Sequence, residues 1–176
     1  MRKVIYLFFA LALTFICSNT FAQTEVVMKA LDGATKLNGG STVAGHVNEI
    51  DVLSNSHGED YCNTCIKPSF SDLSFLISLS PATISFKKLL LNGTKLTSVD
   101  ITYIKQGTTP FEYYKIHMEN VIVESVQESA SSEIPTIAVS FAPDKIAWQQ
   151  IKTAGTQLKS SYGWDIINNT EWLYAF

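Results

Sequence analysis

One short stretch in the first half of the sequence combines three kinds of reactive or metal-binding side chain. The segment HGEDYCNTC contains His57, Glu59, Asp60, Cys62 and Cys65. Two thiolates with an imidazole or a carboxylate can bind zinc, a CxxC dithiol can act as a redox pair, and two oxidised cysteines can form a disulfide. The compartment of the protein favours one of these chemistries over the others.

The N-terminus has the features of a cleaved signal peptide. Two basic residues precede a run at residues 4–16 that is apolar except for Thr14, and the sequence TFA at 20–22 places small residues before a cleavage point. The apolar run holds 13 residues, fewer than the roughly 20 that a membrane-spanning helix needs. We therefore expect a signal peptide at 1–22, cleavage between Ala22 and Gln23, and no membrane insertion of the mature chain.

The mature chain has the size of one domain and an acidic balance. Cleavage would leave 23–176 as a single domain of 154 residues with 11 lysines, no arginine and 16 acidic side chains, about −5 in net charge. The absence of a basic stripe argues against nucleic acid as a partner. The absence of arginine argues against phosphate or carboxylate recognition by bidentate hydrogen bonding.

The two remaining cysteines are expected to pair. An even number of cysteines in an exported chain favours a disulfide between Cys62 and Cys65, which would stiffen one loop and stabilise the fold by about 2 kcal/mol. A zinc site would need His57 and one of Glu59 or Asp60, or a distant ligand, because no second CxxC motif exists. A redox pair normally opens a helix, whereas a nearby proline favours extended backbone here. Zinc binding and redox chemistry stay as alternatives.

The spacing of apolar residues predicts a mainly β fold. Residues 80–93, SPATISFKKLLLNG, predict one flanking α-helix at about 81–92, because Ser80 can act as N-cap, Pro81 suits the first turn and Gly93 suits the C-terminal stop. Residues 54–67 are predicted to form a long polar loop. We expect a compact β-barrel or sandwich of about seven or more strands, from segments of period two at 25–31, 46–54, 68–79, 95–107, 110–129 and 135–151, the last bent at Pro143.

The longest predicted strand has two contrasting faces. Within residues 110–129, the side chains of Tyr114, Ile116 and Met118 are expected in the core. The opposite face carries Lys115, His117 and Glu119, which we expect at a polar surface between subunits or along a lumen.

The sequence contains no recognisable catalytic arrangement. No nucleophile elbow, HExxH motif, phosphate-binding loop or dinucleotide motif is present. The three histidines, His46, His57 and His117, are each expected at a surface or an interface. The three tryptophans are expected in the core or at subunit contacts, or else lining a sugar groove. We therefore predict that the protein is not an enzyme and uses no cofactor or metal.

Several blocks of sequence, in order, resemble the haemolysin-coregulated protein (Hcp) family of type VI secretion. The blocks are MKALDG, GHVNEIDVLS, FSDLSFLISLSPAT, LLLNGTKLTSVDITYIKQG, FEYYKIHMENVIVESVQES and GWDIINNTEW. Together they cover about residues 26–172, and the junction SDLSF…SP, the strand around YKI…VESVQ and the closing GWD…N…W are the most specific.

The resemblance implies a structural protein that forms hexameric rings. In the family, rings stack into a tube and hold effector proteins in the lumen, so the expected partners are copies of the chain, secreted effectors and other secretion-system components. It places residues 54–67 on a loop that touches the neighbouring ring. His57, Glu59 and Asp60 then become candidates for a ring or stacking interface, as do Lys115, His117 and Glu119.

The signal peptide distinguishes this chain from a tube subunit assembled in the cytoplasm. We therefore expect a periplasmic or extracellular relative that forms rings outside the cytoplasm. The alternative is an exported β-rich module that binds carbohydrate or a surface and has no role in secretion.

Overall fold

The structure is a computed structural model that describes residues 24–176 except 65–66, 108, 131–133 and 154–155. The predicted signal peptide, its cleavage point at Ala22 and Gln23, and Cys65 lie outside the described residues. The described elements are β1 (Thr24–Asp32), β2 (Thr35–Lys36), β3 (Ile50–Ser56), β4 (Glu59–Cys62), β5 (Lys67–Phe70), β6 (Leu73–Ser78), α2 (Pro81–Asn92), β7 (Leu96–Lys105), β8 (Phe111–Ser129), β9 (Thr136–Ala142), β10 (Lys145–Thr153), β11 (Thr156–Asp165) and β12 (Thr170–Glu171).

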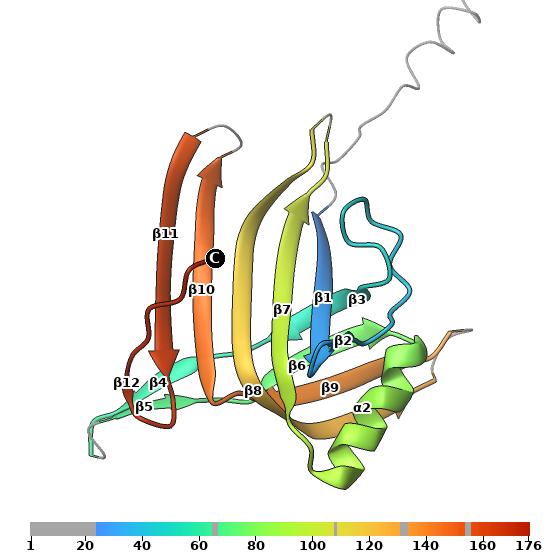
Figure 1. The fold of residues 1–176 in the computed structure, drawn as a ribbon, viewed down its shortest axis with the longest axis horizontal. Helices are drawn as coiled ribbons and strands as arrows, with labels where there is room; N and C mark the ends of the chain where they lie inside the picture. Colours follow the sequence, from blue (N-terminus) through green and yellow to red (C-terminus); the bar gives the residue numbers. More distant parts are fainter. Residues whose placement is uncertain (1–23, 65–66, 108, 131–133, 154–155) are drawn as a thin grey trace, which may run out of the picture.

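Six antiparallel strands close into a barrel, which confirms the predicted fold class. The strands follow the order β8, β7, β1, β3, β6, β9 and return to β8. Closure depends on β8, because its residues up to Val121 pair with β7 and its residues from Ile122 pair with β9. Asn120, at φ 52°, lies just before this change of partner and adopts the left-handed backbone that its short polar side chain tolerates. β8 bends there from one side of the barrel to the other (Figure 1).

Alternating apolar side chains fill the barrel, as predicted for strand 110–129. Ile116 is 1% exposed and Met118 is fully buried. The ring of Phe141 on β9 lies 5.6 Å from the rings of both Phe75 on β6 and Phe86 on α2, measured between centroids. The helix therefore contributes an aromatic side chain directly to the core of the barrel.

The predicted helix is confirmed, but its first turn is capped differently from the prediction. The hydroxyl of Ser80 is buried and has no hydrogen-bond partner among the described residues. Instead, the backbone N–H of Ser80 donates to the hydroxyl of Thr83 at 3.4 Å. At the other end, Gly93 adopts φ 65° and its N–H donates to the carbonyl of Leu90 at 3.2 Å, so the predicted glycine stop is confirmed.

Three strand predictions were wrong in detail. The segment 54–67, predicted as a loop, contains β4, which pairs with β5 in a separate two-stranded hairpin. Pro143 does not bend one strand but lies between β9 and β10, where the N–H of Asp144 donates to the carbonyl of Glu119 at 3.1 Å. The strand predicted to begin at residue 46 begins at Ile50.

The sheet continues beyond the barrel on one side. Strands β10, β11 and β12 follow β8 in order, and the β4–β5 hairpin extends toward the same end of the molecule (Figure 1). After β12 the chain runs back across this sheet, and the N–H of Trp172 donates to the carbonyl of Gly163 at 2.9 Å. A Cβ atom on Gly163 would lie 2.5 Å from the Trp172 carbonyl oxygen, so this close approach requires glycine.

Candidate functional site

The sheet extension and the β4–β5 hairpin enclose an aromatic cleft of about 540 Å³. Its aromatic lining consists of Tyr61, Phe70, Tyr114, Trp148, Tyr162 and Trp164. Trp148 comes from β10, while Tyr162 and Trp164 come from alternate positions of β11, which face the same side of a strand. The rings of Tyr162 and Trp164 are stacked with 6.4 Å between centroids. The arrangement offers a large apolar surface with few polar groups, as is typical of a binding pocket.

The cleft brings together residues that were predicted separately. His57 and Glu59 both line it, with 4.0 Å between the His57 Nε2 and a Glu59 carboxylate oxygen. Asp60 lies next to them in β4 but is exposed and pairs across the hairpin with Ser69. Tyr114, predicted in the core, is half-buried and lines the cleft. Burial raises the pKa of its phenol, and the negative charge of Glu59 adds to the effect.

The tryptophans divide between two surfaces. Trp148 and Trp164 line the cleft. Trp172 instead lies in the C-terminal tail with its ring under the ammonium group of Lys145, 5.1 Å from nitrogen to centroid. The three indoles therefore do not form one sugar-binding groove.

Lys115, His117 and Glu119 share one face of β8 as predicted, but the expectation that His117 lies at a surface is wrong. His117 is only 6% exposed because the ring of Tyr174 stacks on it, 4.0 Å away and within 8° of parallel. On the other side, its Nδ1 lies 2.5 Å from a carboxylate oxygen of Asp100 on β7. Burial raises the pKa of Tyr174, and the negative charges of Asp100 and Glu119 raise it further.

The His117–Asp100 pair resembles a histidine base and the carboxylate that orients it, but no nucleophile accompanies it in the described residues. The Nε2 of His117 is buried without a hydrogen-bond partner there, and the nearest carboxylate oxygen, on Glu119, lies 3.8 Å away. A nucleophile activated by this histidine would have to lie within hydrogen-bond reach of Nε2. The pair links β8 to β7, and His117 also holds the C-terminal tail through its stacking with Tyr174.

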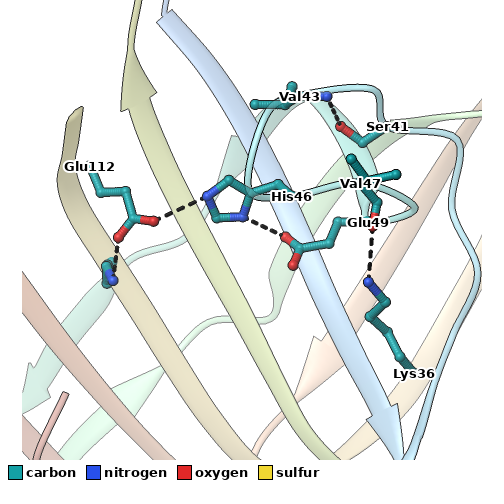
Figure 2. Close-up of polar contacts among 8 residues, drawn as sticks. Lys36, Ser41, Val43, His46, Val47, Glu49 and Glu112 are labelled. Atoms are coloured by element: carbon teal, nitrogen blue, oxygen red, sulfur yellow. Dashed lines mark hydrogen bonds and ion pairs between the residues drawn. The ribbon is translucent and has the colours of Figure 1, made fainter. Parts of the chain in front are cut away.

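A third polar cluster, missed by sequence reasoning, holds the loop 37–49 against the barrel (Figure 2). His46 Nδ1 lies 2.9 Å from the carboxylate oxygen Oε2 of Glu49, and His46 Nε2 lies 3.1 Å from the carboxylate oxygen Oε1 of Glu112 on β8. Both contacts can be hydrogen bonds to carboxylates only when each ring nitrogen carries a proton. Glu112 also forms an ion pair with Lys115. The irregular apolar spacing near Ile50 was the available signal that His46 lies outside a regular strand.

The carboxylate of Glu112 makes the stability of this cluster depend on pH. Burial alone would raise the pKa of Glu112, but hydrogen bonds and charges from Lys115 and His46 outweigh it and hold this pKa below its ordinary value of 4.5. A lowered folded-state pKa stabilises the protein above the unfolded-state pKa, and this contribution is lost as pH falls through the folded-state pKa. We expect Glu112→Gln to lower the free energy of unfolding at pH 7 and to have a smaller effect well below pH 4.5.

Urea unfolding of wild type and Glu112→Gln, at pH 7 and well below pH 4.5, tests this expectation. Glu128→Gln is the matched control, because Glu128 pairs with Lys87 at an exposed site and such pairs contribute only about 0–1 kcal/mol. An effect of Glu112→Gln that is equal at both pH values would contradict it.

The described part of the chain offers no group of three or more His, Cys, Asp or Glu side chains placed to hold a metal ion. Within the same residues, no helix has the length and hydrophobicity needed to cross a membrane. Cys62 ends β4, while its predicted partner Cys65 lies outside the described residues. The predicted disulfide therefore stays a prediction.

Comparison with protein families gives one match that covers most of the described chain. Residues 28–150 match the family model described as "Type VI secretion system effector, Hcp". The chain belongs to the Hcp family. A search of curated protein sequences found no significant relative.

Solved structures of Hcp proteins share the fold. Hcp1 from Salmonella typhimurium has a TM-score of 0.72 at 23% identity, and the match covers 85% of this chain and 100% of Hcp1. A structure described only as a type six secretion system protein has a TM-score of 0.75 at 19% identity, with 85% and 100% covered. The secreted protein Hcp3 from Pseudomonas aeruginosa has a TM-score of 0.64 at 18% identity, with 79% and 97% covered.

Membership of the Hcp family confirms the predicted function as a type VI secretion tube protein. Nothing in these comparisons supports the alternative of an exported binding module unrelated to secretion. The six barrel strands fall within the matched residues 28–150, apart from the first four residues of β1. The part of the sheet beyond this match, β11, β12 and the C-terminal tail, supplies one wall of the aromatic cleft and the cover over His117.

Proposed function

We propose that this Hcp-family chain is exported, assembles into hexameric rings that stack into a tube, and carries effector proteins in the lumen. Other secretion-system components are its further expected partners. The observation that carries the proposal most is the match of residues 28–150 to the Hcp family model. The sheet extension and the hairpin support it, because both reach beyond the barrel at one end and offer surface for a neighbouring subunit (Figure 1).

The proposed interface residues lie on two surfaces. His57, Glu59 and Asp60 belong to the hairpin region, which we assign to contacts between subunits or stacked rings. Lys115 and Glu119 lie on the outward face of β8, with about one third of each side chain exposed. His117 shares this face but is covered by the tail, so we assign it to holding Tyr174 in place rather than to direct contact with a partner.

Ring assembly is tested by light scattering of the purified protein over a range of concentrations. We expect a particle mass of six subunits, and larger particles as rings stack. Because a closed ring uses two different patches on each subunit, the mass should stop at a defined value when stacking is suppressed by salt or dilution. A protein that stays monomeric at high concentration, with tryptophan fluorescence that shifts on adding sugars, would instead favour the binding-module alternative.

We further propose that the mature chain, 23–176, is one domain in the periplasm or medium, and that Cys62 pairs with Cys65. The pair would close the segment between the two strands of the hairpin, because Cys62 ends β4 and Lys67, opposite it in the register, begins β5. A loop stiffened in this way loses less entropy when it docks on a neighbour.

Titration of thiols in the unfolded, unreduced mature protein tests the disulfide. We expect no reactive thiol without reductant, two after reduction, and no stoichiometric zinc by elemental analysis. Two thiols that react without reductant, together with one bound zinc per chain, would favour the zinc site with His57 instead.

A further inference from the structure

Two surfaces of the described chain expose apolar side chains that could pack against a partner. One is the aromatic cleft. The other is the outer face of α2, where Ile84, Lys88 and Leu91 are spaced so that they lie on one side of the helix. Ile84 is 68% exposed and Leu91 is 84% exposed, while the opposite side of α2 packs in the core through Phe86 and Leu89. The outer face is therefore available without unfolding the helix.

The two surfaces lie at opposite ends of the molecule. Along the longest axis, the hairpin and β11 occupy one end, and α2 lies toward the other (Figure 1). Two different patches on opposite ends of one chain can form a head-to-tail contact, and head-to-tail contacts generate closed rings when the rotation between neighbours closes. A cleft that bound the same cleft on another copy would give a two-fold dimer instead.

The charges of the two surfaces are complementary. α2 carries Lys87 and Lys88 and no acidic residue between Pro81 and Asn92. The hairpin strand at the cleft carries Glu59 and Asp60, and the Glu59 side chain is 43% exposed. Complementary charges at the rim of an apolar contact favour the correct pairing and disfavour the contact of like surfaces.

We infer that the outer face of α2 of one copy docks in the aromatic cleft of the next copy, with Ile84 and Leu91 against the aromatic side chains and Lys88 near Glu59. This inference rests on the proposed ring and names the two surfaces that build it. The cleft has a volume of about 540 Å³ and is lined mainly by aromatic side chains, which offer an apolar surface to Ile84 and Leu91. The occupant is a second copy of this chain.

Charge reversal tests the pairing of Lys88 with Glu59. We expect Lys88→Glu and Glu59→Lys each to weaken ring assembly by roughly tenfold or more, because each places like charges together at the contact. The double variant should recover most of the loss. Lys105→Glu is the matched control, since Lys105 is an exposed lysine at the end of β7. Circular dichroism of each variant separates a loss of assembly from a loss of fold.

Cross-linking tests the contact itself. A chain with both Ile84→Cys and Tyr162→Cys should give a ladder of covalent oligomers on oxidation, because the two positions meet only between copies. Each single variant is a control. The inference is overturned if the Lys88→Glu variant still forms rings in light scattering and the double-cysteine variant gives no ladder of covalent oligomers. The ring proposal would still stand after that result. Equal weakening by Lys105→Glu would overturn the inference too, whereas a monomeric wild-type protein would refute the ring proposal.

Discussion

Replacing Phe141 with alanine is expected to lower the free energy of unfolding by about 3–5 kcal/mol. The Phe141 ring is fully buried and lies 5.6 Å from the rings of Phe75 and Phe86. Its removal would leave a cavity where β6, β9 and α2 meet, and the closed barrel allows little collapse around it. Chemical unfolding followed by fluorescence or circular dichroism measures the change.

Leu173→Ala provides the control for this prediction. Leu173 is 89% exposed in the C-terminal tail, so its truncation should change stability by no more than about 0.5 kcal/mol. Equal effects of the two variants would mean that the Phe75–Phe86–Phe141 cluster is not the core of the folded protein.

Replacing Gly39 with alanine is expected to destabilise the protein by roughly 1–3 kcal/mol or more, as overpacking does. A Cβ atom at this position would lie 2.0 Å from the carbonyl oxygen of Glu49. The conflict is with backbone rather than with a flexible side chain, so the loop itself must move. Moving it would break the bond of 2.9 Å from the Gly39 N–H to the Asn48 carbonyl and displace Glu49 from His46.

Gly40 offers a matched control one residue away. A Cβ atom on Gly40 meets nothing within 4 Å, so Gly40→Ala should be tolerated and can even stabilise by restricting the unfolded chain. Thermal unfolding of both variants, side by side, measures the difference. A similar melting temperature for the two would show that the loop 37–49 does not pack as described.

The barrel could be predicted because its signals are local. Alternation of apolar residues in the segment that forms β8 identified Ile116 and Met118 as core, and both are buried. The helix was predictable for the same reason, since Pro81 and Gly93 restrict the backbone at its two ends. These signals depend on residues within a few positions of each other.

Contacts between distant segments were not predictable in this way. His117 alternates like a surface residue, but Tyr174, which covers it, lies 57 positions further along the chain. The alternate aromatic residues at 172, 174 and 176 were a weak signal that the tail packs on a sheet. The aromatic cleft likewise depends on the hairpin, because the polar residues of β4 suggested a loop rather than a strand.

Native mass spectrometry of the exported protein tests export and ring assembly together, because one spectrum gives both the subunit mass and the number of subunits. We expect a subunit that begins at Gln23 and a principal species of six copies, with multiples of six when rings stack. Single subunits at every accessible concentration would contradict ring assembly. A subunit mass that still includes Met1 would contradict export by a cleaved signal peptide.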